Sequence, residues 1–402
     1  MEFRRWKHFC LCSLGGIFPK DSHKSELFAP LIFLVDRPAE CNRGLFAIRE
    51  VDELFEQDSV HLLMPPSQTD NLPELRDFVA KNGAGALNTA FARAFDFLAA
   101  PKKQDHLRLN LIGLGDVGGT VLTALKLLGT NIAHIGLYDP NEAQTLRYEQ
   151  ELNQVLGENL PPVKPCTKDA LFDCDVLLFT ASRGVPEVGS EVKDVRMAQY
   201  ELNRQMLLDY ARQARDANFN GLFCQISDPV DQLSRVVFLH SNRDENGRFD
   251  AKGLLPEQVQ GFGLGVMAAR AAYYAKREAI DFSNGRVYGP HGADLVVANH
   301  PTQFDEALSA RLTAQTVSAN LKVRELGYKP YIAPALSSAA ISILQLLRGE
   351  DHYGAVPIGG AYFGCRSRFT PLGISIEREE LAPALIQKLD AVHRKLERFC
   401  YD

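Results

Sequence analysis

The stretch from Leu107 to Gly119 reads LRLNLIGLGDVGG, an apolar run followed directly by spaced glycines. This order predicts a strand that turns sharply at Gly113 into a helix over Val117–Leu128. Gly115 would allow a ligand to approach the backbone closely, and Gly118 would allow the helix to pack against the strand. Because a helix N-terminus favours anions, the turn is typical of a pyrophosphate site.

A second apolar run, Ile132–Tyr138, ends at Asp139. A carboxylate there accepts hydrogen bonds from ribose hydroxyls and repels a 2′-phosphate, and no arginine directly follows it, so we expect NAD rather than NADP. A glycine triplet alone is a weak signal, but strand, triplet, helix, strand and acid in this order form a much stronger one. The cofactor-binding residues predicted are Gly113, Gly115, Asp116, Val117, Gly118, Asp139, Thr180 and Ala181.

The composition excludes several classes of protein. The chain has 402 residues, 46% of them hydrophobic, which suits a globular protein of two or three domains. Its net charge is −6, and no basic stripe is interleaved with aromatic residues, so we expect no nucleic-acid partner. The eight cysteines match neither a disulfide framework nor zinc-ligand spacing, so we predict no metal site and reduced thiols.

The N-terminal run Phe9–Phe18 follows basic residues but has glycines within it and no cleavage site after it, so we do not interpret it as a signal peptide. No stretch reaches the roughly 18 apolar residues of a membrane span. We therefore expect a cytoplasmic protein without a membrane partner.

The predicted fold class is α/β. Four apolar runs alternate with helical segments and predict a doubly wound parallel sheet: Leu107–Gly113, Ile132–Tyr138, Val176–Thr180 and Gly221–Ile226. We assign an accessory domain to residues 1–105, an NAD-binding Rossmann domain to 106–235 and a mixed α/β substrate domain to 236–402. In the small N-terminal block we expect a helix and three strands: Pro73–Val79, Pro30–Val35, Gly44–Ile48 and Val60–Met64.

An enzyme that transfers a hydride from a nicotinamide cofactor needs three groups of its own. These are a proton donor, a group that anchors the substrate and a group that polarises the substrate carbonyl. His291, in Gly289-Pro290-His291-Gly292, titrates near neutral pH and can exchange a proton. Arg196 follows a loop that could close over a substrate. Arg270 lies in an otherwise largely apolar helix, where a substrate carboxylate would satisfy it. The alternatives are a turn histidine, a solvated helix charge and a structural ion pair, respectively.

From about Leu107 onward the chain resembles the L-lactate/malate dehydrogenases, whereas the first 105 residues lie outside the resemblance. It is carried by the glycine turn, by Gly289–Gly292, by the spacing from Arg196 to Asn203, and by Ser227-Asp228-Pro229-Val230-Asp231, which is similar to a Ser-Asn-Pro-Val-Asp segment. The resemblance implies that His291 is the acid/base, that Arg196 polarises the carbonyl and that Arg270 anchors the substrate carboxylate.

Two departures concern the histidine. The family aspartate that orients it is Met267 here, so the imidazolium loses a partner and its tautomer is less fixed. The family asparagine is Asp228 here. We expect Asp228 to supply the missing negative charge from a neighbouring strand end, and so assign it to the catalytic set. The alternative is an aspartate that stabilises the turn before Pro229.

Other departures concern the substrate. The loop before Arg196 is longer than the lactate-type pattern, and Glu187 stands where malate-type members have an arginine after Gly-Val-Pro. An acid there would repel a dicarboxylate, although Arg183 or Lys193 could substitute. Lys329 stands where the family usually has a threonine beside the substrate. We therefore assign Lys329 to substrate binding, in a pocket unlike the standard lactate pocket.

We thus expect an NAD-dependent oxidoreductase that interconverts a 2-oxo acid and an L-2-hydroxy acid, as a homo-oligomer. One alternative is malate-type specificity. Another is a non-catalytic NAD-binding sensor or interaction protein, suggested by Met267 and the extra N-terminal block. A third, an NAD- and metal-dependent glycosidase, would need a cysteine in the asparagine-proline turn, whereas Cys224 stands four residues before Asp228. The sequence leaves open the substrate side chain, the number of subunits and the role of residues 1–105.

Overall fold

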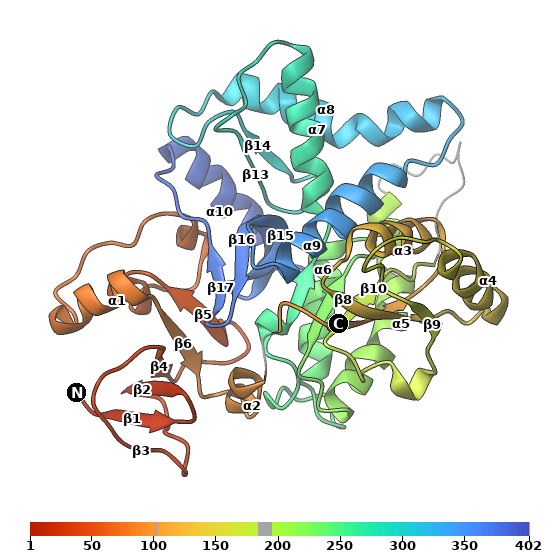
Figure 1. The fold of residues 1–402 in the computed structure, drawn as a ribbon. Coiled ribbons are helices and arrows are strands. Elements are labelled where there is room, and N and C mark those ends of the chain that lie inside the picture. Colours follow the sequence, from red (N-terminus) through yellow and green to blue (C-terminus); the bar gives the residue numbers. More distant parts are fainter. Residues whose placement is uncertain (101–102, 184–194, 402) are drawn as a thin grey trace.

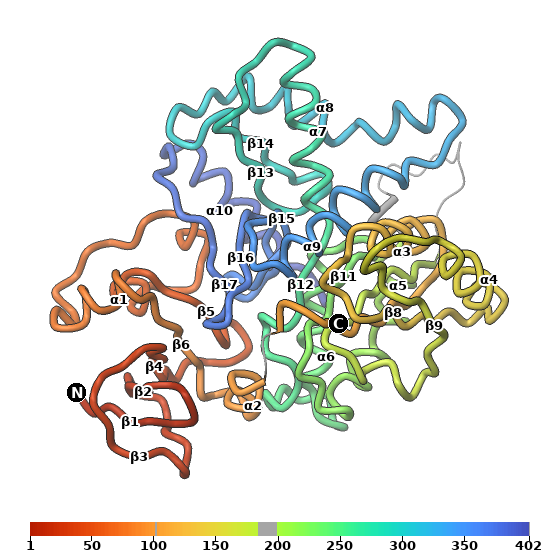
Figure 2. Tube along the Cα trace, viewed as in Figure 1, coloured from red at the N-terminus to blue at the C-terminus, as the bar shows by residue number. Residues whose placement is uncertain are grey.

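A sheet of 15 strands runs through the residues that the computed structural model describes, which are 1–100, 103–183 and 195–401, without the side chains of 195–198 (Figure 1). The strand order is β3-β1-β2-β4-β6-β5-β17-β16-β15-β12-β11-β10-β7-β8-β9. The N-terminal block lies at one end of this sheet and the parallel strands at the other, with the C-terminal strands between them (Figure 2).

The predicted doubly wound parallel sheet is present. Its strands are β7 (Leu107–Ile112), β8 (Ile132–Tyr138), β9 (Val163–Pro165), β10 (Val176–Phe179), β11 (Leu222–Gln225) and β12 (Val259–Gly261), and each is parallel to its neighbour. The helices between them are α3 (Asp116–Leu128), α4 (Glu142–Asn153), α5 (Val195–Asp216) and α6 (Val230–Ser241). Strands β10 and β11 are buried at every position, because helices cover both faces.

The C-terminal part is mixed α/β, as predicted. It contains α7 (Leu264–Arg277), β13 (Arg286–Tyr288), β14 (Val296–Ala298), α8 (Glu306–Glu325), a π-helix over Pro334–Ile341, α9 (Ser342–Leu347), β15 (His352–Ile358), β16 (Ala361–Thr370), β17 (Gly373–Ile376) and α10 (Pro383–Glu397). The long antiparallel hairpin β15–β16 was not predicted. The last helix begins at Pro383, since the fixed φ of proline suits the first helical position.

The N-terminal block contains β1 (Phe3–Trp6), β2 (Phe9–Leu14), β3 (His23–Lys24), β4 (Leu31–Val35), β5 (Leu45–Ile48), α1 (Arg76–Asn82), β6 (Ala84–Asn88) and α2 (Ala94–Ala99). Strand β5 pairs in parallel with β17, which joins the block to the rest of the sheet. The buried carboxylate of Glu257 reinforces this junction, because it accepts hydrogen bonds from the backbone N–H groups of Gly44 (2.9 Å) and Leu45 (3.0 Å). Burial raises the pKa of Glu257 to about 7.

One predicted strand of this block is wrong. Val60–Met64 was expected to be extended, but Val60–Leu63 forms a 3-10 helix whose N-cap is Ser59. Its apolar side chains pack in the same core cluster as Leu385 and Leu389 of α10. A short buried apolar run suits a strand or a helical turn equally well, and here the packing partner is a helix.

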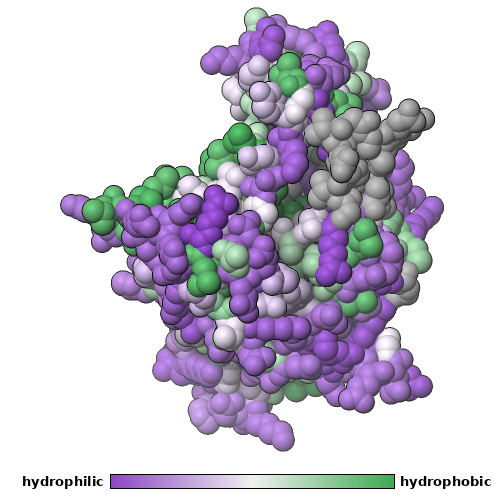
Figure 3. Space-filling view, turned by 90° about the vertical axis from the view of Figure 1, so that its right-hand side faces the viewer, coloured by the Kyte–Doolittle hydropathy of each residue, from purple (hydrophilic) through white to green (hydrophobic). Residues whose placement is uncertain are grey.

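The lobe that carries α8, β13 and β14 rises above the rest of the molecule (Figures 1 and 3). On the face shown in Figure 3, hydrophilic residues predominate and hydrophobic ones are scattered among them. Within the described ranges, no helix combines the length and the apolar character needed to cross a membrane.

Candidate active site

The glycine turn has the geometry that its sequence predicts. Gly113 has φ +94°, and a Cβ there would lie 2.6 Å from the backbone of Ala181. A Cβ at Gly118 would overlap the carbonyl oxygen of Gly113 and lie 2.5 Å from Thr180 Oγ1. A Cβ at Gly115 would meet nothing within 4 Å. Two glycines therefore serve packing, whereas Gly115 borders open space.

The N-terminus of α3 lies at this open space. The helix has 13 residues and begins at Asp116. Its N-cap is Gly115, so no capping side chain accepts a hydrogen bond from the first turn. The partial positive charge of such a terminus favours an anion. This geometry fits the pyrophosphate of a dinucleotide, with Val117 and Gly118 in the first turn.

Asp139 and Thr180 hold the turn from the neighbouring strands. Asp139 Oδ2 accepts a hydrogen bond from Leu114 N (2.7 Å), and its Oδ1 accepts one from Asn141 N (2.9 Å). Thr180 Oγ1 donates to the carbonyl oxygen of Gly113 (2.7 Å). The residues predicted to bind the cofactor thus come together at the carboxyl ends of β7, β8 and β10, where open α/β sheets bind ligands.

Lys329 lies beside this turn. Its Nζ is 2.9 Å from Asp116 Oδ2, and the carboxylate raises the pKa of Lys329 above its ordinary value. Both side chains are largely exposed, so the pair contributes little to stability. Its predicted contact with substrate stays a prediction.

His291 is buried between two carboxylates. Its Nε2 lies 2.7 Å from Asp228 Oδ1, and its Nδ1 lies 3.6 Å from Asp231 Oδ2. Asp231 Oδ2 also accepts a hydrogen bond from the backbone N–H of His291 (3.3 Å). The Asp228 side chain is 37% exposed and that of Asp231 only 4%. One carboxylate therefore faces the ring from an accessible side, and the other from the interior.

Asp231 was not predicted from the sequence to act on His291. Asp231 lies in the first turn of α6, directly after the strand end that carries Asp228. The sequence did contain a signal for Asp231. It is a second acid three residues after Asp228, and it lies in the first turn of the helix that begins at Val230. Gly263, the N-cap of α7, was also missed: a Cβ there would overlap the imidazole, at 2.5 Å from its Cγ.

Met267 is fully buried in α7 and belongs to a hydrophobic cluster. Arg270, one turn later, is half-buried, and its Nη1 lies 3.8 Å from Met267 Sδ. The structure thus puts the predicted anchor on the helix whose N-terminal glycine touches His291. Its contact with substrate stays a prediction.

Asn203 connects the two halves of the site. Its buried Nδ2 donates to the carbonyl oxygen of Asp228 (2.7 Å), and its Oδ1 accepts from Arg183 N (2.7 Å). Ser227 Oγ donates to the carbonyl oxygen of Ala181, which packs on Gly113. A continuous series of contacts therefore leads from the glycine turn to His291.

Three predicted or discussed residues lie partly or wholly outside the described part of the chain. The side chain of Arg196 is not described, although its backbone lies in α5, and Glu187 and Lys193 fall in residues 184–194.

Cys224, considered for the glycosidase alternative, is fully buried in β11. Among the described residues, no three His, Cys, Asp or Glu side chains are grouped so as to hold a metal ion.

Malate and lactate dehydrogenases are among the known proteins that this chain is similar to. No family model matches the chain. A probable malate dehydrogenase of Campylobacter jejuni is 28% identical over 282 residues, which cover 65% of this chain and 86% of that protein. An L-lactate dehydrogenase 1 of Enterococcus faecalis is 28% identical over 200 residues, or 48% of this chain and 55% of that protein.

Solved structures share the fold. A lactate dehydrogenase from a deep-sea metagenome library superposes with a TM-score of 0.59 at 16% identity and covers 73% of this chain and 98% of its own. The malate dehydrogenase of Aeropyrum pernix gives 0.58 at 17% identity, covering 72% and 96%. Together with the glycine turn and the segments around Asp228 and His291, these relatives support the resemblance of this chain to the L-lactate/malate dehydrogenase family, and they leave part of the chain uncovered.

Proposed function

We propose that this protein is an NAD-dependent oxidoreductase that interconverts a 2-oxo acid and an L-2-hydroxy acid, with His291 as the acid/base. The observation that carries the proposal is the series of contacts from Gly113 through Ala181 and Ser227 to the Asp228–His291 pair. It joins a turn suited to a dinucleotide to a histidine that can exchange a proton.

The residues present fit NAD. The first turn of α3 and the open space at Gly115 would hold the pyrophosphate, and Asp139 would accept hydrogen bonds from the ribose. When bound, NAD supplies the hydride acceptor and NADH the hydride donor. The carboxylate of Asp139 would disfavour a 2′-phosphate, which favours NAD over NADP.

The residues of the protein transfer one proton and bind the carboxylate of the substrate. During reduction, a proton at His291 Nε2 passes to the carbonyl oxygen of the 2-oxo acid, and oxidation reverses this transfer. Asp228 Oδ1 holds the proton until the substrate oxygen takes its place. At 3.6 Å, Asp231 is too far for a good hydrogen bond to Nδ1, so it acts on the ring through its charge. Arg270 would hold the substrate carboxylate and Arg196 would polarise the carbonyl.

A second function is favoured by two observations. Asp228 Oδ1 lies within hydrogen-bond distance of Nε2, the nitrogen that would contact the substrate. In addition, the buried Met267 stands where the family has the aspartate that orients the histidine. An NAD-binding sensor without turnover would tolerate both features. A screen of 2-oxo acids that includes pyruvate and oxaloacetate, followed by NADH absorbance, separates the two functions and distinguishes lactate-type from malate-type specificity. NADH binding without any turnover would support the sensor.

The two glycines of the turn give a matched test of cofactor binding. We expect Gly115→Ala to leave the melting temperature unchanged, because its Cβ meets nothing within 4 Å. It should weaken NAD binding at least about tenfold, or about 1.4 kcal/mol, since the methyl group enters the pyrophosphate space. Gly118→Ala should instead destabilise the fold by about 1–3 kcal/mol through overpacking. Calorimetric NAD titration and thermal unfolding measure both effects, and unchanged NAD affinity in Gly115→Ala would place the cofactor elsewhere.

The anchor role of Arg270 can be tested against a second arginine of α7. Arg270→Lys should raise the KM for the 2-oxo acid by about 10- to 100-fold, because a point charge does not reproduce a bidentate clamp on a carboxylate. NAD affinity should stay unchanged. Arg277→Lys is the control, since Arg277 is exposed and contacts Tyr273. Steady-state kinetics equal to wild type in Arg270→Lys would make Arg270 structural.

A further inference from the structure

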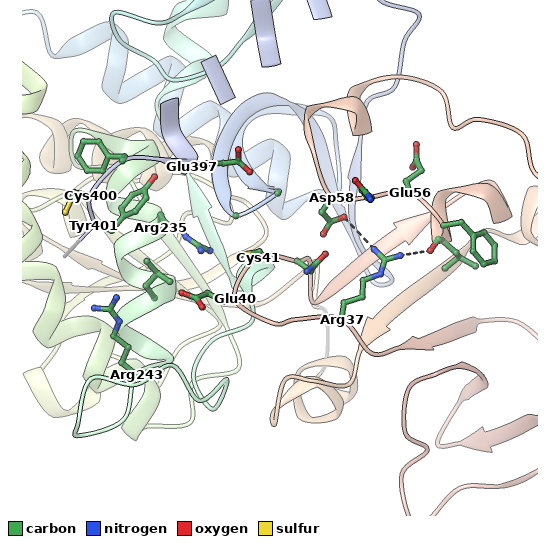
Figure 4. Close-up of a pocket in the computed structure, with 18 residues that line it drawn as sticks. Arg37, Glu40, Cys41, Glu56, Asp58, Arg235, Arg243, Glu397, Cys400 and Tyr401 are labelled. Carbon is green, nitrogen blue, oxygen red and sulfur yellow. Dashed lines mark hydrogen bonds and ion pairs between the residues drawn. The ribbon is translucent and has the colours of Figure 1, made fainter. Parts of the chain in front are cut away.

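A cavity of about 830 Å³ lies outside the residues discussed so far (Figure 4). Its walls come from the N-terminal block around Arg37 and Asp58, from α6, from the β15–β16 turn and from the C-terminal segment that includes Tyr401. None of the residues assigned to cofactor, substrate or proton transfer lines it. We call it the Arg235 cavity, after the α6 arginine that projects into it.

Arg235 is a buried cation that forms no ion pair with any carboxylate of the described residues. The residue is only 7% exposed, and its Nε has no hydrogen-bond partner among the described residues. None of the described carboxylates forms an ion pair with it, and its Cζ lies 5.1 Å from the centroid of the Phe238 ring. Burial lowers the pKa of Arg235. Buried charges are normally paired, because desolvation of an unpaired one costs several kcal/mol.

The acids around the cavity have other partners. Asp58 pairs with Arg43 (2.8 Å) and lies 3.8 Å from Arg37, and Glu56 pairs with Arg378 (2.8 Å). The two buried tyrosine hydroxyls near Arg235 donate to backbone carbonyls: Tyr362 to Pro256 and Tyr401 to Leu396. Glu397 lies 3.6 Å from His393. Glu40 is exposed and acts on Arg235 through its charge, so among the described acids it is a candidate to compete with a ligand.

The size and chemistry of the cavity define a class of ligand. Its volume falls within the roughly 300–1,000 Å³ of small-molecule sites. A guanidinium fork matches the oxygen pairs of a carboxylate or a phosphate. Phe55 and Phe399 contribute apolar surface to its lining. We propose that the Arg235 cavity binds a small organic anion, a carboxylate or a phosphate ester, whose charged group pairs with Arg235.

The test is calorimetric titration of the full-length protein with citrate and, separately, with inorganic phosphate, at an ionic strength held constant with sodium chloride. We expect saturable binding of at least one probe, weakened at least about tenfold in Arg235→Gln and less in Arg235→Lys. Arg394→Gln is the control, because Arg394 is 60% exposed on α10 and already pairs with Asp390. Which probe binds more tightly identifies the carboxylate or the phosphate.

Three comparison variants separate the proposal from its rivals: Gly115→Ala, Arg235→Met and Glu40→Gln. Binding that survives in Arg235→Gln but disappears in Gly115→Ala would place the anion at the glycine turn and overturn the proposal. Thermal unfolding without added anion gives the second readout. We expect Arg235→Met to melt at or above the wild-type temperature, because it removes an unbalanced buried charge. Equal destabilisation by Arg235→Met and Glu40→Gln would make Glu40 the partner and overturn the proposal, as would saturable binding of neither probe.

Discussion

We expect His291→Asn to lower kcat for 2-oxo acid reduction by about 10²- to 10⁴-fold, which is the usual contribution of a positioned acid/base. NAD affinity should not change, because His291 does not contact the glycine turn directly. His300→Asn is the control, since His300 lies in a loop of the same domain and accepts hydrogen bonds from its own loop backbone. Wild-type kcat in His291→Asn would remove His291 from the mechanism and favour the sensor.

A second variant moves the ring without removing it. A Cβ at Gly263 would overlap His291, at 2.5 Å from its Cγ, so Gly263→Ala must displace the imidazole. A displacement of about 1 Å can cost about 10²-fold in rate. We therefore expect kcat to fall while NAD binding is kept. Because the protein retains its histidine, this variant tests the position of the ring rather than its chemistry.

The second large effect concerns the two carboxylates. Reduction needs the imidazolium, which a nearby negative charge favours. Asp228→Asn removes the charge 2.7 Å from Nε2, so the pH above which reduction falls should drop, and activity at neutral pH should fall with it. Asp231→Asn should shift the profile in the same direction and also lower stability, because it weakens the acceptor for the His291 backbone N–H.

Full pH–rate profiles of both variants and of the double variant measure this effect. If both carboxylates act on one histidine, the shifts should not add, whereas simple additivity would argue for independent sites. Asp228→Glu should keep most of the wild-type profile, because it keeps the charge. An unchanged or higher rate in Asp228→Asn would make Asp228 a turn residue before Pro229.

Much of the nucleotide half of this protein was predictable because its signals are local. The φ of Gly113, the space beside Gly115 and the packing of Gly118 depend on a few neighbouring residues, and β7, α3 and β8 follow from short periodic runs. The segments around Asp228 and His291 were also found in this way. Their contact was expected only because a missing charge had to be supplied from somewhere.

The rest depended on contacts between residues far apart in the chain. Val60–Leu63 became a helical turn because α10 packs on it, and β5 joined the sheet through β17, more than 300 residues later. Asp231 became a partner of His291 only when α6 and the loop after β13 came together. The sequence by itself determined the glycine turn, the parallel strands and the residue types available for proton transfer, because these depend on local backbone conformation and periodicity. Tertiary structure alone decided which carboxylates surround His291 and left Arg235 buried beside a cavity, because burial and pairing depend on which distant segments pack together.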